Sequence, residues 1–91
     1  MRSVRLRITG RVQGVGYRAW AIATAARLGL RGWVRNRADG SVEALVIGAE
    51  ESVAAMIEAC RIGPFAARVT EISVTAAADD GSAGFRPCAT M

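Results

Sequence analysis

The stretch GWVRNRADGSVEALVI, residues 32–47, decides the fold, because it predicts a hairpin in the middle of the chain. The dipeptide Asp39-Gly40 divides the stretch, and Asp-Gly is the strongest short signal for a two-residue hairpin turn, in which both central residues need positive φ. We therefore predict strands over 32–37 and 41–47, paired antiparallel across this turn.

A helical pattern lies on each side of the hairpin. Apolar residues recur at helical spacing over 19–30, where Gly29 is a plausible stop, and again over 53–60. Acidic residues precede the second pattern, where the helix dipole favours them, and Gly63-Pro64 follows it. The hairpin is therefore predicted to join two helices.

Strands are also predicted at the outer ends of the pattern. Residues 4–10 alternate apolar and polar side chains, and residues 68–77 are rich in β-branched ones. Residues 84–86 predict a short fifth strand, which must lie at an edge because Pro87 cannot donate to a ladder. The order is β-α-β-β-α-β in one domain, residues 1–91. Two helices cannot cover both faces of such a sheet, so we expect them on one face of an antiparallel sheet, with the other face toward solvent.

The composition limits the chemistry that the chain can perform. All 12 basic residues are Arg, the net charge is +4, and there is no His, which excludes an imidazole base or ligand. A positive charge favours anionic partners, although codon bias also explains an Arg-rich, Lys-free chain.

Cys60 and Cys88 are too few for a disulfide framework and lack metal-binding spacing. No apolar run approaches the roughly 20 residues of a membrane span, and no secretory signal is recognisable. We expect a cytoplasmic protein with no metal or other cofactor and no membrane partner.

The most informative segment for function is Gln13-Gly14-Val15-Gly16-Tyr17-Arg18, between the first strand and the first helix. Its glycines let the main chain curl, and the N–H groups at a helix start have no intrahelical partner, so the segment can bind a tetrahedral anion. Arg18 adds a planar fork that can hold two phosphate oxygens. A tight turn with an ordinary surface arginine explains the same residues equally well.

Two further features bear on the site. Gly14-Val-Gly-Tyr-Arg-Ala19 satisfies the G-x-G-x-x-A dinucleotide pattern, but the acidic residue that would follow, Asp39, belongs to a hairpin rather than to a parallel crossover. We reject that interpretation.

Asparagine is a poor strand former, and Asn36 lies within a predicted strand. Its position indicates either an exposed residue near a turn or an amide that binds a water molecule.

Two long blocks resemble the acylphosphatase family: GRVQGVGYR, residues 10–18, and GWVRN with DGSVE, residues 32–36 and 39–43. The likeness runs from about Val4 to Val74, and Gly63-Pro64 belongs to a third, weaker block. The resemblance implies a ferredoxin-like open-faced α+β sandwich and metal-free hydrolysis of acyl phosphates to a carboxylate and orthophosphate. By position, Arg18 matches the family's phosphate-binding arginine and Asn36 its water-orienting asparagine. The phosphate-binding backbone amides would be those of Gly14, Val15, Gly16, Tyr17 and Arg18.

Hydrolysis of an acyl phosphate requires few catalytic groups, which agrees with the small set of candidate residues. Its leaving group is a carboxylate, whose conjugate acid has a pKa near 4, so no general acid is needed at neutral pH. We expect a small-molecule acyl phosphate as substrate, with inorganic phosphate or sulfate able to fill the site.

Two other functions share this fold. A small basic RNA-binding module would stack bases on sheet aromatics, but Trp33 is the only plausible platform, and specific nucleic-acid binding is not expected. An anion-binding regulatory module without turnover is the other alternative, against which the pair Arg18 and Asn36 argues. With no obvious large apolar patch, we expect a monomer.

Overall fold

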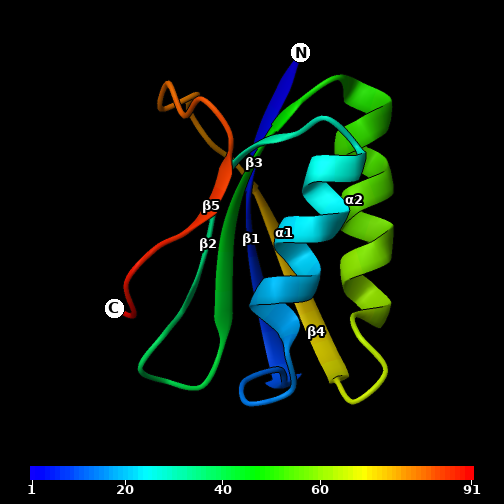
Figure 1. Ribbon diagram of the computed structural model, residues 1–91, viewed down its shortest axis with the longest axis vertical. Helices are drawn as coiled ribbons and strands as arrows, with labels where there is room; N and C mark the ends of the chain where they lie inside the picture. The colour runs from blue at the N-terminus through cyan, green and yellow to red at the C-terminus, as the bar shows by residue number, and fades with distance from the viewer.

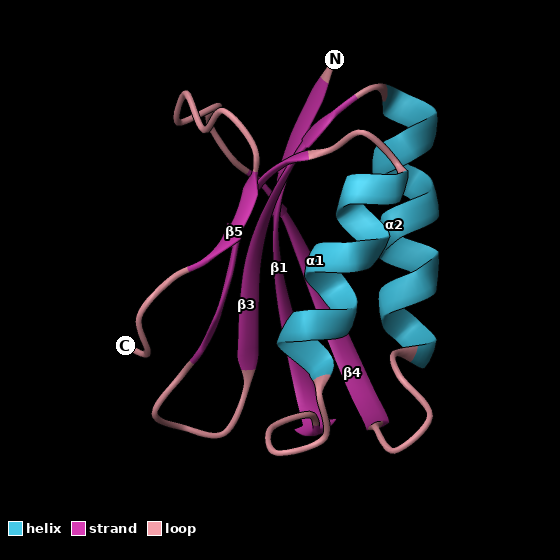
Figure 2. Cartoon of the chain, in the orientation of Figure 1, coloured by secondary structure: helices cyan, strands magenta, loops and turns pink.

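Five strands form one sheet in the order β4-β1-β3-β2-β5 in the computed structural model, which describes residues 1–91 (Figure 1). The strands are β1 (Arg2–Arg11), β2 (Arg31–Asn36), β3 (Val42–Gly48), β4 (Arg68–Ala76) and β5 (Phe85–Pro87). Two helices, α1 (Tyr17–Arg27) and α2 (Glu50–Ile62), lie on the same face (Figure 2). Neither is long and apolar enough to cross a membrane. The predicted β-α-β-β-α-β order, the helices on one face and the short fifth edge strand are confirmed.

The topology consists of two interlocked β-α-β units. Strand β3 is antiparallel to both β1 and β2, so β1 and β2 run parallel with β3 between them, and α1 connects them. In the same way α2 connects β3 to β4, with β1 between them. Each helix therefore starts at one end of the sheet and returns the chain to the other. The beginning of α1 and the end of β2 consequently meet at the same end.

The core lies between the sheet and the helices. Alternation along β1 turns Val4, Leu6 and Ile8 toward the helices, and all three are buried, whereas Arg5 and Arg7 on the other face are exposed. The apolar residues that recur at helical spacing in α2 pack against these three side chains from the helix side. This agrees with the alternation in the sequence, which predicted one buried and one polar face for the first strand.

A register shift interrupts the pairing of β1 with β4 between Thr9 and Gly10. Gly10 has φ 122°, and a Cβ there would lie 2.1 Å from the carbonyl oxygen of Arg68. Only glycine allows this approach. The bulge bends the end of β1 just before the loop that leads into α1, which is where β-bulges often redirect a chain near a site.

The β2–β3 connection differs from the predicted two-residue turn. Gly40 has φ 93°, but Asp39 does not have positive φ. The N–H of Arg37 donates to Ser41 O at 2.8 Å and the N–H of Gly40 to Arg37 O at 3.1 Å, which makes a turn over 37–40 whose last residue, Gly40, is in the left-handed region. Longer hairpin loops of this kind also place Asp before Gly, so the dipeptide predicts the hairpin but not the loop length.

In addition to the predicted elements, one segment of the chain covers part of the sheet face opposite the helices. Because β4 and β5 form opposite edges, the chain between them crosses this face (Figure 1). Arg31 holds the crossing segment by donating to Ser82 O at 2.8 Å and to Asp79 at 2.5 and 3.2 Å. Leu45 and Ile47, on this face by alternation, are buried yet lie outside the helix-side core. The sequence analysis missed this cover, because charged and small residues gave no sign that the segment would pack.

The crossing also sets the direction of β5. It begins at the sheet end where β4 finishes, so it must run opposite to β4 and parallel to β2, and the sheet is antiparallel over its other four strands. The pairs are Gly32 with Phe85, Trp33 with Arg86 and Val34 with Pro87. As predicted from Pro87, this strand lies at an edge.

Gly32 offers a test of this packing. Its φ is 134°, and an added Cβ would lie 1.8 Å from Leu45 O. We expect Gly32→Ala to lower the free energy of unfolding by about 3 kcal/mol or more, because the strand backbone must move. In the control Gly84→Ala, the new Cβ meets nothing within 4 Å, so we expect a change within about 0.5 kcal/mol. Urea unfolding measures both, and equal losses would contradict the assigned strand contact.

Candidate active site

A hollow of about 330 Å³ opens at the end of the sheet where α1 begins. The loop between β1 and α1 lines it with Val12, Gln13, Gly14 and Gly16. The first turns of α1 add Tyr17, Arg18, Ala19 and Ile22, and Asn36 of β2 and Pro87 of β5 form the opposite wall. Arg18 and Asn36, chosen from the sequence, thus line one hollow. Of the five residues whose amides were predicted to bind phosphate, Val15 alone does not line it, because its side chain packs against the core.

The loop has the backbone shape of an anion-binding nest. Gly14 and Gly16 have φ 72° and 80°, while Val15 between them does not have positive φ. Such alternation of handedness turns successive N–H groups toward one concave side. The N–H groups of residues 14–18 donate to no backbone or side-chain acceptor in the protein, and Gly16 caps α1 without a side-chain hydrogen bond. We call this stretch, residues 14–18, the amide cradle. Its donors are available to a ligand.

Tyr17 anchors the cradle to the second helix. Its hydroxyl donates to Cys60 O at 2.7 Å, and its ring meets Trp20 edge to face with centroids 5.3 Å apart. Gly63 lies directly against the ring, since a Cβ there would be 2.7 Å from it. Burial raises the pKa of Tyr17 well above its ordinary value, so the hydroxyl stays protonated and keeps donating. The start of α1 is therefore held to the end of α2.

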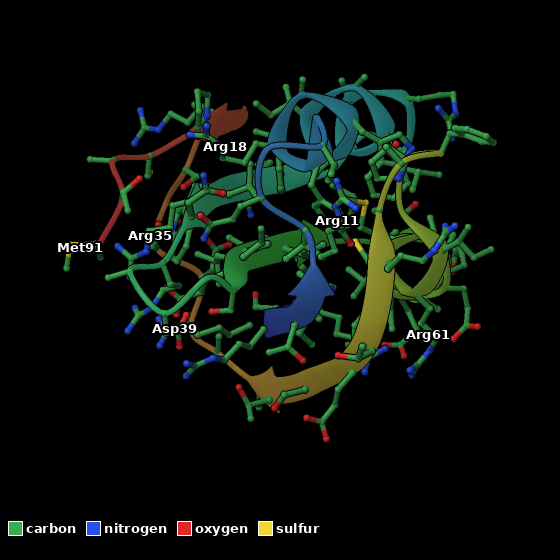
Figure 3. All side chains as sticks on the ribbon, turned by 90° about the horizontal axis from the view of Figure 1, so that it is seen from below. Arg11, Arg18, Arg35, Asp39, Arg61 and Met91 are labelled. Atoms are coloured by element: carbon green, nitrogen blue, oxygen red, sulfur yellow. The ribbon has the colours of Figure 1, made fainter.

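Arg18 is the second residue of α1 and is exposed. It makes no ion pair and no hydrogen bond with any protein group, so its fork of donors is available beside the cradle. Figure 3, seen from the end of the sheet that carries the site, shows Arg18 on the side of β5. No carboxylate lines the hollow, which leaves Arg18 as its one charged group.

Gln13 connects the cradle to the hairpin. Its side-chain amide donates to Arg37 O at 2.8 Å and to Ser41 O at 2.9 Å, the two carbonyls at the base of the β2–β3 loop. The sequence analysis assigned no role to Gln13. Only the register of the folded hairpin brings these two carbonyls together. No sequence pattern near Gln13 could therefore have predicted this contact of its side chain.

Asn36 is the last residue of β2, and alternation from the buried Val34 puts its side chain on the helix side, facing α1. Its carbonyl accepts from the N–H of Met91 at 3.2 Å, and Met91 O accepts from Ala38 N at 2.9 Å. Cys88 N donates to Val34 O at 2.9 Å, which extends the parallel pairing beyond β5. The segment 85–91 thus lies along β2 and holds the backbone on either side of Asn36.

The carboxylates near this end of the sheet interact with other protein groups and do not line the hollow. Asp39 accepts from the hydroxyl and N–H of Ser41 at 2.6 and 2.9 Å and pairs with Arg7. Ser41 first and Arg7 second lower the pKa of Asp39 from 3.8 to about 2. Burial would raise the pKa of Glu43, but Arg35 and Arg37, at 2.8 and 3.1 Å, outweigh it and lower that pKa. Both groups therefore stay anionic on the far face, away from the hollow.

Comparison with known proteins agrees with this geometry. The family model described as Acylphosphatase matches residues 4–87. The chain belongs to the acylphosphatase family. It is 55% identical over 85 residues to an acylphosphatase of Rhodospirillum rubrum, covering 93% of both chains. It is 62% identical over 73 residues to one of Rhodopseudomonas palustris, covering 80% of this chain and 74% of the other. The crystal structure of acylphosphatase from Bacillus subtilis superposes with a TM-score of 0.93 at 39% identity, covering 97% and 99% of the two chains.

The β2–β3 loop, which Gln13 contacts, should contribute less to the stability of the fold at acid pH. The pKa of Asp39 is lower in the fold than its ordinary 3.8, so its carboxylate stabilises the fold above that pH, and the contribution is lost as the pH falls toward 2. We expect Asp39→Asn, which keeps an acceptor oxygen for Ser41, to lose less stability than the unmodified acylphosphatase between about pH 5 and pH 2.5.

Urea unfolding at the two pH values measures this loss. The control is Glu51→Gln, which removes an exposed carboxylate that makes no ion pair. Its decline should match that of the unmodified protein. If Asp39→Asn declines just as steeply, the loop does not depend on this charge.

Proposed function

We propose that the amide cradle, Arg18 and Asn36 carry out the hydrolysis of acyl phosphates, the activity that membership of the acylphosphatase family gives this chain. One observation carries the proposal. The N–H groups of residues 14–18 have no acceptor within the protein, and they adjoin a hollow that holds one arginine and no carboxylate. Such a set of donors suits a tetrahedral anion such as a phosphoryl group.

The cradle and Arg18 would bind and stabilise the phosphoryl group. In phosphoryl transfer the charge is spread over three equatorial oxygens, and catalysis is mostly positioning and electrostatic stabilisation. N–H donors held in place before the reaction need no reorganisation as that charge moves. Arg18 can grip two oxygens at once and has no competing partner in the protein. The carboxylate leaving group needs no proton, so the lack of any acid in the hollow is no obstacle.

Asn36 would align the attacking water. Its amide can both accept from water and donate to it, and it carries no charge that would repel the dianion. The side chain faces α1 and lines the same hollow as Arg18. The water attacks phosphorus opposite the departing carboxylate oxygen, and a phosphoryl oxygen receives its proton. The bond from phosphorus to the acyl oxygen breaks, releasing carboxylate and orthophosphate.

The RNA-binding alternative loses its stacking platform. Trp33 is on the face opposite the helices, but the guanidinium of Arg35 lies 4.7 Å from the centre of its ring. Arg35 is itself held by Glu43, so this ring face is already occupied.

We further propose that the chain acts as one domain and as a monomer in the cytoplasm. The amide cradle, Arg18 and Asn36 all belong to one chain, so the proposed site does not require a second copy. Cys60 and Cys88 are both free thiols, which suits a reducing compartment. Light scattering of the purified protein tests the monomer, and fractionation of cells tests the compartment.

Arg18→Ala tests the phosphate contact. We expect kcat/KM for benzoyl phosphate to fall about 100-fold or more and inhibition by inorganic phosphate to weaken, because a preorganised donor to the transition state is lost. Arg27→Ala is the matched control, since Arg27 is also an exposed arginine of α1 without an ion-pair partner, at the helix end away from the cradle. It should stay within about twofold of the unmodified enzyme. Equal hydrolysis by both variants would refute the role of Arg18.

Asn36→Ala tests the alignment of water. We expect kcat to fall about 100-fold while KM and phosphate inhibition change little, because a water-positioning group acts mainly in the transition state. Steady-state kinetics with benzoyl phosphate separate the two parameters. Weakened phosphate inhibition with a normal kcat would instead make Asn36 a binding residue.

A further inference from the structure

We propose that Arg11 and Arg68 form a second anion site, which binds a phosphate group outside the hollow. We call these two residues the arginine pair. Both are exposed, and neither lines the hollow. Figure 3 shows Arg11 at the same end of the molecule as Arg18, but on the side of β4 rather than of β5. The inference concerns binding alone and holds whether or not the amide cradle hydrolyses acyl phosphates.

The sheet register places the two arginines next to each other. Arg11 is the last residue of β1, Arg68 is the first residue of β4, and the two are partners in the antiparallel ladder. The Cβ atoms of such partners lie about 5 Å apart on one face of a sheet. Both guanidinium groups therefore start from neighbouring positions, at the end of the sheet where the cradle begins.

No carboxylate neutralises the arginine pair. Strand β1 contains no acidic residue, and Glu71, the one acidic residue of β4, is the register partner of Thr9 and forms no ion pair. Two like charges that face each other across a ladder cost stability. An anion bound between them would turn this repulsion into two attractions.

The donors of the pair are available to a ligand. Arg68 donates one N–H to Ala67 O at 3.3 Å, which holds its guanidinium at the start of β4 and leaves its other donors unused. The side chain of Arg11 makes no hydrogen bond and no ion pair. Each guanidinium has five N–H donors in a planar fork. Two such forks can hold a tetrahedral group from two sides.

The charge and shape of the pair favour phosphate over a carboxylate. A phosphate group carries about two negative charges near neutral pH and can offer each guanidinium a pair of oxygens. A single carboxylate has one charge and two oxygens, so it can engage only one of the two arginines in this way. The ligand is therefore a phosphate group, either free or as part of a phosphorylated metabolite.

NMR titration with inorganic phosphate tests the site residue by residue. We expect the side-chain Nε–H signals of Arg11 and Arg68 to shift and to reach half-saturation on the order of 1 mM, because exposed charge pairs bind weakly. Sodium chloride at the same ionic strength should leave both signals nearly unchanged. A second titration uses glycerol 3-phosphate. Shifts of the same signals extend the ligand to phosphorylated metabolites, and their absence limits it to free phosphate.

Single substitutions separate the arginine pair from the cradle. Arg11→Gln should weaken phosphate binding at Arg68 about tenfold or more, and Arg68→Gln should do the same at Arg11, because the anion loses one of its two forks. Arg18→Ala, which removes a donor beside the cradle, should leave both responses unchanged. The matched control is Arg27→Gln, which removes an exposed arginine without an ion pair from the far end of α1 and should also change neither.

Thermal unfolding gives a second readout, which does not depend on the basal stability of a variant. We expect about 20 mM phosphate to raise the Tm of the unmodified protein and of Arg27→Gln by about 3 °C more than it raises that of Arg68→Gln. The part of the rise that Arg68→Gln retains comes from phosphate in the cradle.

Three results would overturn the proposal. Chloride could shift the two signals as strongly as phosphate does, which would mean that salt only screens the pair. The two signals could stop responding in Arg18→Ala, which would mean that they report on the cradle. Arg68→Gln could keep the full phosphate-dependent rise in Tm, which would mean that no anion bound to the pair stabilises the fold. None of these results bears on hydrolysis by the cradle, which the kinetics of Arg18→Ala and Asn36→Ala test separately.

Discussion

A loop that keeps its N–H groups unpaired for a ligand cannot be held by backbone hydrogen bonds of its own, and this constraint shapes the rest of the site. The amide cradle is held by side chains at each of its ends. Gln13 donates to two carbonyls at the base of the hairpin, and Tyr17 donates to the last turn of α2. Because both anchors are buried or partly buried, they are shielded from competing water. The N–H donors of the cradle are thus kept in place by hydrogen bonds outside the surface that a ligand would contact.

Gln13 and the C-terminal segment explain how residues so distant in the sequence come to lie around one hollow. Gln13 fixes the cradle to the loop that follows Asn36, and the segment 85–91 holds the backbone of Asn36 from the other side. Pro87 enters the hollow only because β5 runs parallel to β2, and β5 runs that way because the chain crosses the sheet face after β4. A contact on the far face, Arg31 with Asp79 and Ser82, therefore contributes to the position of the hollow's outer wall.

The features that could be predicted from the sequence are those with local causes. Alternation in residues 4–10, helical spacing over 19–30 and 53–60, and the Asp39-Gly40 turn each depend on a few neighbouring residues, so the order of elements followed from them. The loop length at Asp39 was wrong because Asp-Gly suits two kinds of hairpin. The cover on the far sheet face and the contacts of Gln13 depend on residues 24 or more positions apart or on sheet register, which no local pattern contains. Arg18 and Asn36 were chosen from the family resemblance, because local chemistry left their roles open; both line one hollow, and their roles stay a prediction.

Charge is distributed so that the cradle end of the molecule stays positive. Several carboxylates pair with arginines: Glu43 with Arg5, Arg35 and Arg37, Asp39 with Arg7, and Asp79 with Arg31. Arg11 and Arg68, by contrast, are register partners where β1 and β4 reach the site end, and neither forms an ion pair with a carboxylate. Facing like charges cost stability in a sheet, so this pair is expected to lower the stability of the β1–β4 edge. Together with Arg18, the one charged residue that lines the hollow, this pair adds positive charge at the site end of the sheet, which favours the approach of anions.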